Sequence, residues 1–223
     1  RSTRPTDKET HMPTAIASNP PKQGRSRVAL EKLLKATREI LSEGTFEQLT
    51  ISGISKRSGV SVGSIYARFE GKDELFLAVM ADVLAELDAE WADLMNSLRS
   101  RQLPLIEKVP SIISALAEHL KSHASILKPF MARGSDPRVA VFGKATHLKT
   151  AQKFKELLLE SQAEFKHPDP DHAVSACFSF AYASLARFLG LGSAADAAGE
   201  GDWEQLKRDL GVMCVGFLKN EGA

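Results

Sequence analysis

Apolar residues recur every three or four positions along most of the chain from Arg27 onward, which is the period of an amphipathic α-helix. The longest such stripe covers about 72–98 and predicts a helix roughly 40 Å long at 1.5 Å per residue. Shorter stripes predict helices at about 27–43, 104–120, 124–131, 137–162, 171–189 and 202–219. The pattern therefore predicts an all-α protein.

Between the first stripe and the long one lies the segment Thr50–Lys72, which predicts two short helices joined by a tight turn. Gly59 suits the turn because glycine takes a positive φ without strain. Thr50 and Ser61 carry the hydroxyls that cap helix N-termini. The outward face of the second helix is small and polar at its start and basic at its end, and it consists of Val62, Gly63, Ser64, Tyr66 and Arg68. A helix with such a face fits the major groove of DNA.

A family signature runs through the same segment, at the positions Thr50, Ile51, Ile54, Ser55, Ser58, Gly59, Val60, Ser61, Gly63, Ser64, Ile65, Tyr66, Phe69 and Lys72. This run resembles the signature of the TetR family of bacterial transcriptional regulators. The family usually has alanine at the two positions of Ser55 and Ser58, and often threonine at Ser64. The resemblance implies a three-helix DNA-binding domain with a helix-turn-helix, joined by a long helix to a helical domain that binds a ligand and dimerises.

Phosphate contacts are expected at both ends of the second helix. The tyrosine and lysine that match Tyr66 and Lys72 contact phosphates in the family, so the resemblance implies that role here. Thr50 can bond a phosphate while capping its helix, and Arg68 can grip a phosphate or favour the helix C-terminus. Base edges are expected against the first turn, made of Ser61, Val62, Gly63 and Ser64, with Ser61 mainly a cap. These side chains do not by themselves fix a base sequence.

Charge divides the chain into a basic front and an acidic back. Residues 1–72 hold 13 Lys and Arg against 7 Asp and Glu, whereas residues 73–223 hold 16 against 21. This division suits a protein that presents one end to phosphates. We expect a disordered tail over 1–26, a DNA-binding domain over 27–72, and an effector-binding and dimerisation domain over 73–223. The tail alone holds 5 basic and 2 acidic residues, so it contributes part of the basic excess.

The second domain offers walls for an apolar cavity of the kind that small effectors use. The resemblance implies such a cavity between the C-terminal helices. Each candidate is also an ordinary core residue by its pattern alone, and the candidates are Trp91, Met95, Phe130, Met131, His147, Phe178 and Tyr182.

The helix predicted at 171–189 is apolar on nearly every side, so it must be buried on two faces. One face can pack in its own core and the other against a second copy of the chain. We expect the last two helices to form a four-helix dimer interface, and the resemblance implies the same.

Other chemistries find little support. His119 and His123 have the i, i+4 spacing of metal ligands, but no Cys or carboxylate cluster in the sequence completes a set, so we expect neither a metal nor a cofactor. Cys177 and Cys214 are expected to be buried thiols, with a disulfide left open. The chain lacks a run of about 18 apolar residues and the common catalytic motifs, so we expect a cytoplasmic protein that is not an enzyme.

The leading interpretation is a homodimeric repressor that binds a palindromic operator and is released by a small molecule of unknown identity. The alternatives are an activator or an effector-independent DNA-binding protein. A small-molecule binding protein or enzyme with a vestigial DNA module is a third interpretation. The operator sequence and the regulated genes do not follow from the sequence.

Overall fold

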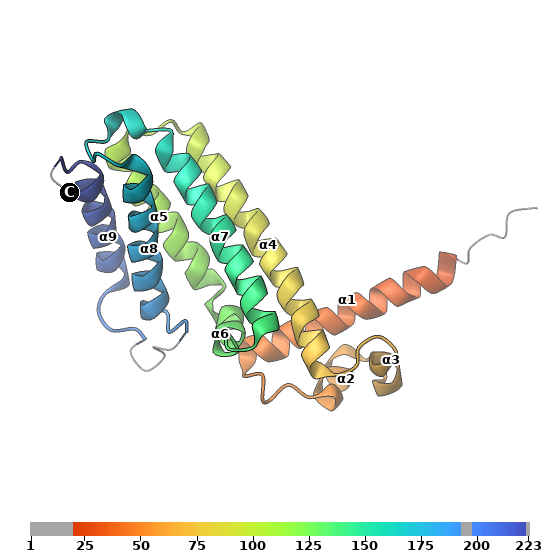
Figure 1. Ribbon diagram of the computed structural model, residues 1–223. Coiled ribbons are helices and arrows are strands. Elements are labelled where there is room, and N and C mark those ends of the chain that lie inside the picture. The colour runs from red at the N-terminus through yellow and green to blue at the C-terminus, as the bar shows by residue number, and fades with distance from the viewer. Residues whose placement is uncertain (1–19, 193–197, 222–223) are drawn as a thin grey trace, which may run out of the picture.

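The computed structural model describes residues 20–192 and 198–221 of the 223-residue chain, and their regular structure is helical (Figure 1). The expected all-α fold is confirmed. The helices are α1 Pro20–Glu43, α2 Ile51–Ser58, α3 Val62–Tyr66, α4 Lys72–Ser100, α5 Leu105–Ser122, α6 Ala124–Ala132, α7 Pro137–Leu159, the short 3₁₀ helix η1 Gln162–Glu164, α8 Pro170–Phe188 and α9 Trp203–Leu218.

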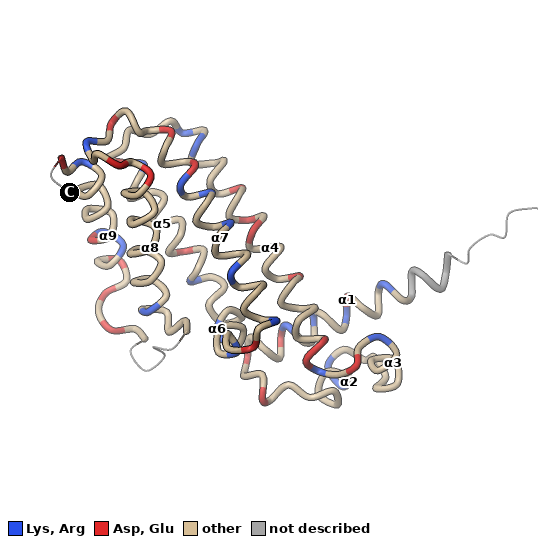
Figure 2. The backbone as a smooth tube through the Cα atoms, in the orientation of Figure 1, with Lys and Arg blue, Asp and Glu red and all other residues tan. Residues whose placement is uncertain are grey.

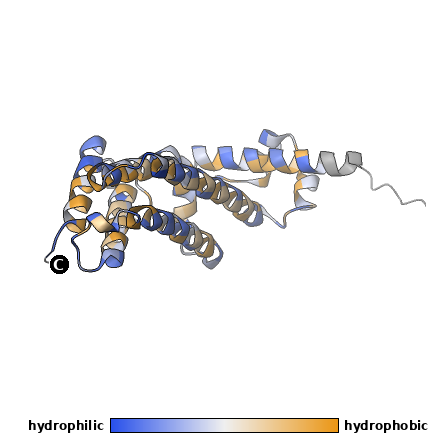
Figure 3. Cartoon of the chain, turned by 90° about the horizontal axis from the view of Figure 1, so that it is seen from above, coloured by the Kyte–Doolittle hydropathy of each residue, from blue (hydrophilic) through white to orange (hydrophobic). Residues whose placement is uncertain are grey.

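Helix α1 begins earlier than the apolar stripe indicates. Residues 1–19 of the expected disordered tail lie outside the described residues, but residues 20–26 form the first turns of α1, so that part of the expectation is wrong. The two prolines stand at the first two helical positions, where backbone N–H groups have no acceptor within the helix, so they do not interrupt it. Seen from above, α1 extends well beyond the body of the other helices (Figure 3).

Local chemistry defines the two short helices as the sequence predicts. The Thr50 hydroxyl accepts a hydrogen bond from the Gly53 N–H at 3.0 Å, and the Ser61 hydroxyl accepts one from the Ser64 N–H at 3.2 Å. Gly59 ends α2 with φ of 69°, in the left-handed region that favours glycine. The two caps and the glycine turn are therefore confirmed.

The N-terminal helices share a small apolar core. It is built from fully buried side chains of α1, α2, α3 and the loop before α2, namely Leu33, Leu41, Leu49, Ile54 and Ile65. Helices as short as α2 and α3 are unstable alone, so α1 supplies the surface against which they fold. This core fixes which face of α3 is left outward.

The long helix α4 leads from this N-terminal module into the second half of the molecule, where α5, α7, α8 and α9 lie beside it (Figure 1). Helices α4 and α7 both begin near the module and run in the same direction. The Trp91 indole N–H of α4 donates to the Thr150 carbonyl of α7 at 3.1 Å, which links the two helices within the core. Lys and Arg side chains occur along α1 and around α2 and α3 (Figure 2).

The two cysteines lie where α8 and α9 pack together. Cys177 and Cys214 are both buried and both free, as the first of the two expectations has it. Each thiol donates weakly to the backbone carbonyl of the other residue, at 3.8 and 3.9 Å. No helix among the described residues has the length and apolar character needed to cross a membrane.

Candidate nucleic-acid interface and internal cavity

Helix α3 presents one face to solvent and buries the other. Ile65 is fully buried, while Val62 is 42% and Tyr66 57% exposed, and Ser61 and Gly63 are also exposed. An exposed valine and tyrosine on a helix of five residues have no partner within the chain to explain them. The outward face thus consists of the residues that the sequence places against DNA.

The basic residues near α3 are held by contacts inside the chain. The Arg68 guanidinium donates to the Ser64 carbonyl at 3.2 Å and to the Ser26 hydroxyl at 3.0 Å, which ties α3 to α1. The Lys72 ammonium donates to the Phe46 carbonyl at 3.3 Å and is half-buried. The structure thus brings Arg68 and Lys72 to the same end of the molecule as the α3 face, with side chains already oriented.

A cavity of about 370 Å³ lies among α4, α5, α6, α7 and α8. Phe130, Met131, His147 and Tyr182 line it, whereas Trp91, Met95 and Phe178 are not among its lining side chains. Most of the remaining wall is apolar and escaped the sequence reasoning, because these residues fit the core pattern equally well: Met80, Leu84, Leu87, His119, Leu120, Leu127, Gly134, Val139, Ala140, Gly143, Lys144, Thr146, Thr150 and Gly192.

Polar groups interrupt the wall on one side. The His147 ring stands edge to face against Tyr182 at 4.7 Å and packs on Phe178 at 5.3 Å, so Phe178 supports the wall from behind. Burial lowers the pKa of His147 and raises the pKa of Tyr182, so both groups are neutral near pH 7. Lys144 lies on the same helix as His147. The cavity therefore combines an apolar interior with one ammonium and neutral hydrogen-bonding groups.

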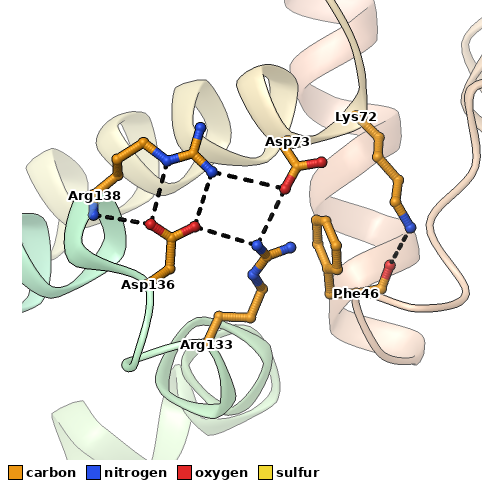
Figure 4. Close-up of polar contacts among 6 residues, drawn as sticks. All are labelled: Phe46, Lys72, Asp73, Arg133, Asp136 and Arg138. Carbon is orange, nitrogen blue, oxygen red and sulfur yellow. Dashed lines mark hydrogen bonds and ion pairs between the residues drawn. The ribbon is translucent and has the colours of Figure 1, made fainter.

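An ion-pair cluster joins α6 and α7 to the start of α4 (Figure 4). The Arg133 guanidinium lies 3.1 Å from Asp73 and 3.3 Å from Asp136, and Arg138 pairs with the same two carboxylates at 3.9 and 2.9 Å. The hydrogen bond from Arg138 lowers the pKa of Asp136 to about 2. The sequence marks Asp136 only as a helix cap, and it gives no signal that Arg133 and Asp73 meet.

Phe46 connects this cluster to Lys72 and to the cavity. The Arg133 guanidinium carbon lies 3.7 Å from the centre of the Phe46 ring, and the Lys72 nitrogen lies 4.3 Å from it. The Phe46 ring makes an edge contact with Phe76 at 5.1 Å, and Phe76 makes one with Phe130 at 5.5 Å. Since Phe130 lines the cavity, an unbroken set of ring contacts leads from the cavity to Lys72.

Comparison with known proteins places this arrangement. Residues 33–79 match the model of the bacterial regulatory proteins of the tetR family. The HTH-type transcriptional regulator BetI of Vibrio vulnificus is 27% identical over 112 residues, which make up 50% of this chain and 56% of that protein. BetI 2 of Chromohalobacter salexigens is 36% identical over 67 residues, 30% of this chain and 32% of that protein. The chain thus spans about half the length of the curated relatives it matches.

Solved structures resemble the chain over more of its length. A protein of Mesorhizobium loti assigned to the TetR family gives a TM-score of 0.67 at 15% identity, covering 87% of this chain and 96% of that one. The regulator FadR of Bacillus subtilis, solved in complex with stearoyl-CoA, gives 0.62 at 17% identity, covering 84% and 98%. At these identities the likeness shows the fold alone.

Proposed function

This chain belongs to the TetR family of bacterial regulators, and from that premise we propose that it is a cytoplasmic, homodimeric repressor released from a palindromic operator by a small molecule. In this proposal residues 27–72 bind DNA, and residues 73–223 bind the effector and dimerise. Members of the family are DNA-binding regulators, in agreement with the expectation that the chain is not an enzyme.

The exposed face of α3 is the observation that carries the proposal. The side chains of Val62 and Tyr66 project from a helix whose other side is fixed by Ile65 in the small core. A valine meets a thymine methyl in the major groove, and a phenol bonds a phosphate at the groove edge. Gly63 lets the backbone come close to the bases. Two such helices, about one duplex turn apart in a dimer, would contact the two halves of a palindrome.

Operator selection from random duplexes with the purified protein tests this proposal. We expect enrichment of a palindrome, and loss of its gel shift in the variant Ser64→Arg with Tyr66→Ala. Arg101→Ala, at the far end of α4, is the matched control and should bind like the unchanged protein. If no sequence is enriched at low salt, or if the double variant binds the operator normally, α3 does not have the proposed role.

The proposed effector is small and mostly apolar, with a polar or anionic end. The cavity volume lies at the low end of the range of about 300–1,000 Å³ that small-molecule sites show. An anionic end would be met by Lys144, and a hydrogen-bonding group by His147 or Tyr182. Because FadR of Bacillus subtilis was solved with stearoyl-CoA, acyl compounds of graded chain length are the first to test.

Release would proceed through the contacts between the cavity and Lys72. A ligand that displaces Phe130 also displaces Phe76 and Phe46, against which the Lys72 ammonium is held. The ion pairs of Arg133 and Arg138 with Asp73 fix the start of α4 to the α6–α7 turn, so α4 follows a movement of that turn. The ligand shifts the equilibrium only by its difference in affinity for the two conformations.

A gel-shift titration with the selected operator measures this coupling. An effector should weaken operator binding in the unchanged protein and act less strongly in Arg133→Met, which removes the ion pairs and the stacking on Phe46. Lys128→Met, an exposed change on α6, is the control. An equal effect of the ligand on all three proteins would show that the coupling does not use this cluster.

A further inference from the structure

Three side chains from two helices converge on the side of α5 that faces α4. Glu90 lies on α4, and His119 and His123 lie one turn apart on α5. The Glu90 carboxylate oxygen Oε2 is 2.7 Å from Nε2 of His123 and 3.8 Å from Nδ1 of His119. All three ligand atoms lie within 4.8 Å of one another. The carboxylate comes from a helix 29 or more residues away in sequence and completes the set that the two histidines lack locally.

We propose that Glu90, His119 and His123 bind a divalent transition-metal ion of the zinc class, with one coordination position left for water or another ligand. Ligands at 2.0–2.1 Å from a tetrahedral ion lie about 3.3 Å apart, and the two Glu90 distances lie on either side of that value. Small rotations of exposed Glu90 therefore suffice to form the site. Two imidazoles with one carboxylate favour zinc-class ions over magnesium or calcium, which prefer oxygen ligands.

The surroundings hold the histidines and give an ion a path. His119 is buried, and its ring packs 5.7 Å from the Trp91 ring and 5.1 Å from the His123 ring, which fixes both imidazoles relative to α4. An open groove reaches the site, and Glu90, Asp93, Glu118 and His119 are among its lining residues. Three carboxylates in one groove create a negative potential that raises the local concentration of cations.

A bound ion would matter for regulation because it would join α4 to α5. Helix α4 begins at Lys72, so the ion would restrain the helix that carries a proposed phosphate contact. His119 also lines the cavity proposed for the effector, so one side chain serves both sites. The metal site stands on its own geometry, and its test does not require that the chain bind DNA.

Titration of the tag-free full chain with Zn²⁺ alone, followed by calorimetry and thermal unfolding, tests the proposal. We expect one ion per chain and a rise in melting temperature that Mg²⁺ at the same concentration does not give. His123→Gln and Glu90→Gln should each weaken Zn²⁺ binding at least about tenfold, since loss of even an outer-shell partner of a metal site costs about 10–100-fold. The exposed His172 of α8 supplies the matched control, and His172→Gln should bind Zn²⁺ like the unchanged chain.

A second readout uses Co²⁺, whose visible absorption becomes intense when the ion is tetrahedral. That absorption should appear with the unchanged chain and be lost in both cluster variants, whose helicity by circular dichroism should remain intact. Zn²⁺ affinity that is equal in the unchanged chain, His123→Gln and Glu90→Gln would overturn the proposal, as would the absence of measurable Zn²⁺ binding by the unchanged chain. Operator binding that fails while Zn²⁺ binding persists would contradict the proposed function alone.

Discussion

Replacing Val212 and Met213 of α9 by serine should dissociate the proposed dimer. These side chains are 71% and 62% exposed in the single chain, and Phe180 of the adjacent helix α8 is 60% exposed. Isolated exposed apolar residues are common, but three large ones on two packed helices mark an interaction surface. The loss of two of them should therefore weaken association strongly.

The magnitude follows from the exposed fractions. Full burial of a valine or methionine side chain stabilises by about 2 kcal/mol, so burial of the exposed parts contributes about 1.4 kcal/mol for Val212 and about 1.2 kcal/mol for Met213. In a two-fold symmetric interface each residue counts twice, which gives about 5 kcal/mol for the dimer. Since about 1.4 kcal/mol corresponds to a tenfold change, the dissociation constant should rise by about three orders of magnitude.

Sedimentation velocity over a concentration series measures the dissociation constant. The control is Val141→Ser with Leu148→Ser on α7, where the two side chains are 69% and 56% exposed and so lose comparable apolar area. We expect the control to dimerise like the unchanged chain. Equal dissociation constants for the α9 variant and the unchanged chain would refute the assignment, and a larger effect of the α7 variant would move the interface to α7.

Three further predictions concern the N-terminal module and the cavity. Gly59→Ala should lower the free energy of unfolding in urea by about 1 kcal/mol, because φ of 69° disfavours a β-carbon. Gly63→Ala should not destabilise the helical backbone but should weaken the operator gel shift, because its methyl group would stand between α3 and the bases. Lys72→Met should reduce the salt dependence of operator binding, with log K losing a slope of about 0.9 per phosphate contact, and Arg101→Met should not. The lowered pKa of His147 means that the unfolded chain binds more protons just below pH 6.5, so stability should fall as the pH drops through that range. Urea unfolding at pH 5 and pH 7 should show a smaller fall in His147→Gln, although Lys144, His119 and Tyr182 share the cavity and their charges remain.

The helices were predictable because each depends on local chemistry. The apolar period gives α4 and α5 within a few residues, and Asp136 with Pro137 marks the start of α7 as a cap followed by a proline. The turn at Gly59 follows from one conformational preference. The early start of α1 was missed because a polar, proline-containing segment is typical of disorder, and only the position of its prolines within the first turn makes a helix possible.

The cavity was predictable only in part. Phe130, Met131, His147 and Tyr182 were identified as candidates and line it, but Trp91 and Phe178 have the same aromatic character and stand outside the lining set. An apolar period assigns a residue to the inward face of a helix, and inward faces include both close-packed core and cavity wall. The difference depends on how five helices approach one another, which local sequence does not encode.

The residues that join distant segments show where sequence reasoning ends. His119 and His123 have metal-ligand spacing, yet only the packing of α4 on α5 brings Glu90 within 2.7 Å of His123. A shift of one turn between these helices would move the carboxylate by about 5.4 Å and remove the contact, while the apolar stripe of each helix would be unchanged. The loop between the helices and the side chains packed beneath them therefore decide whether a metal site exists, and a search by local spacing cannot detect it. The same holds for Arg133 on Phe46, so contacts between segments, rather than motifs, are where undetected functions of this chain should be sought.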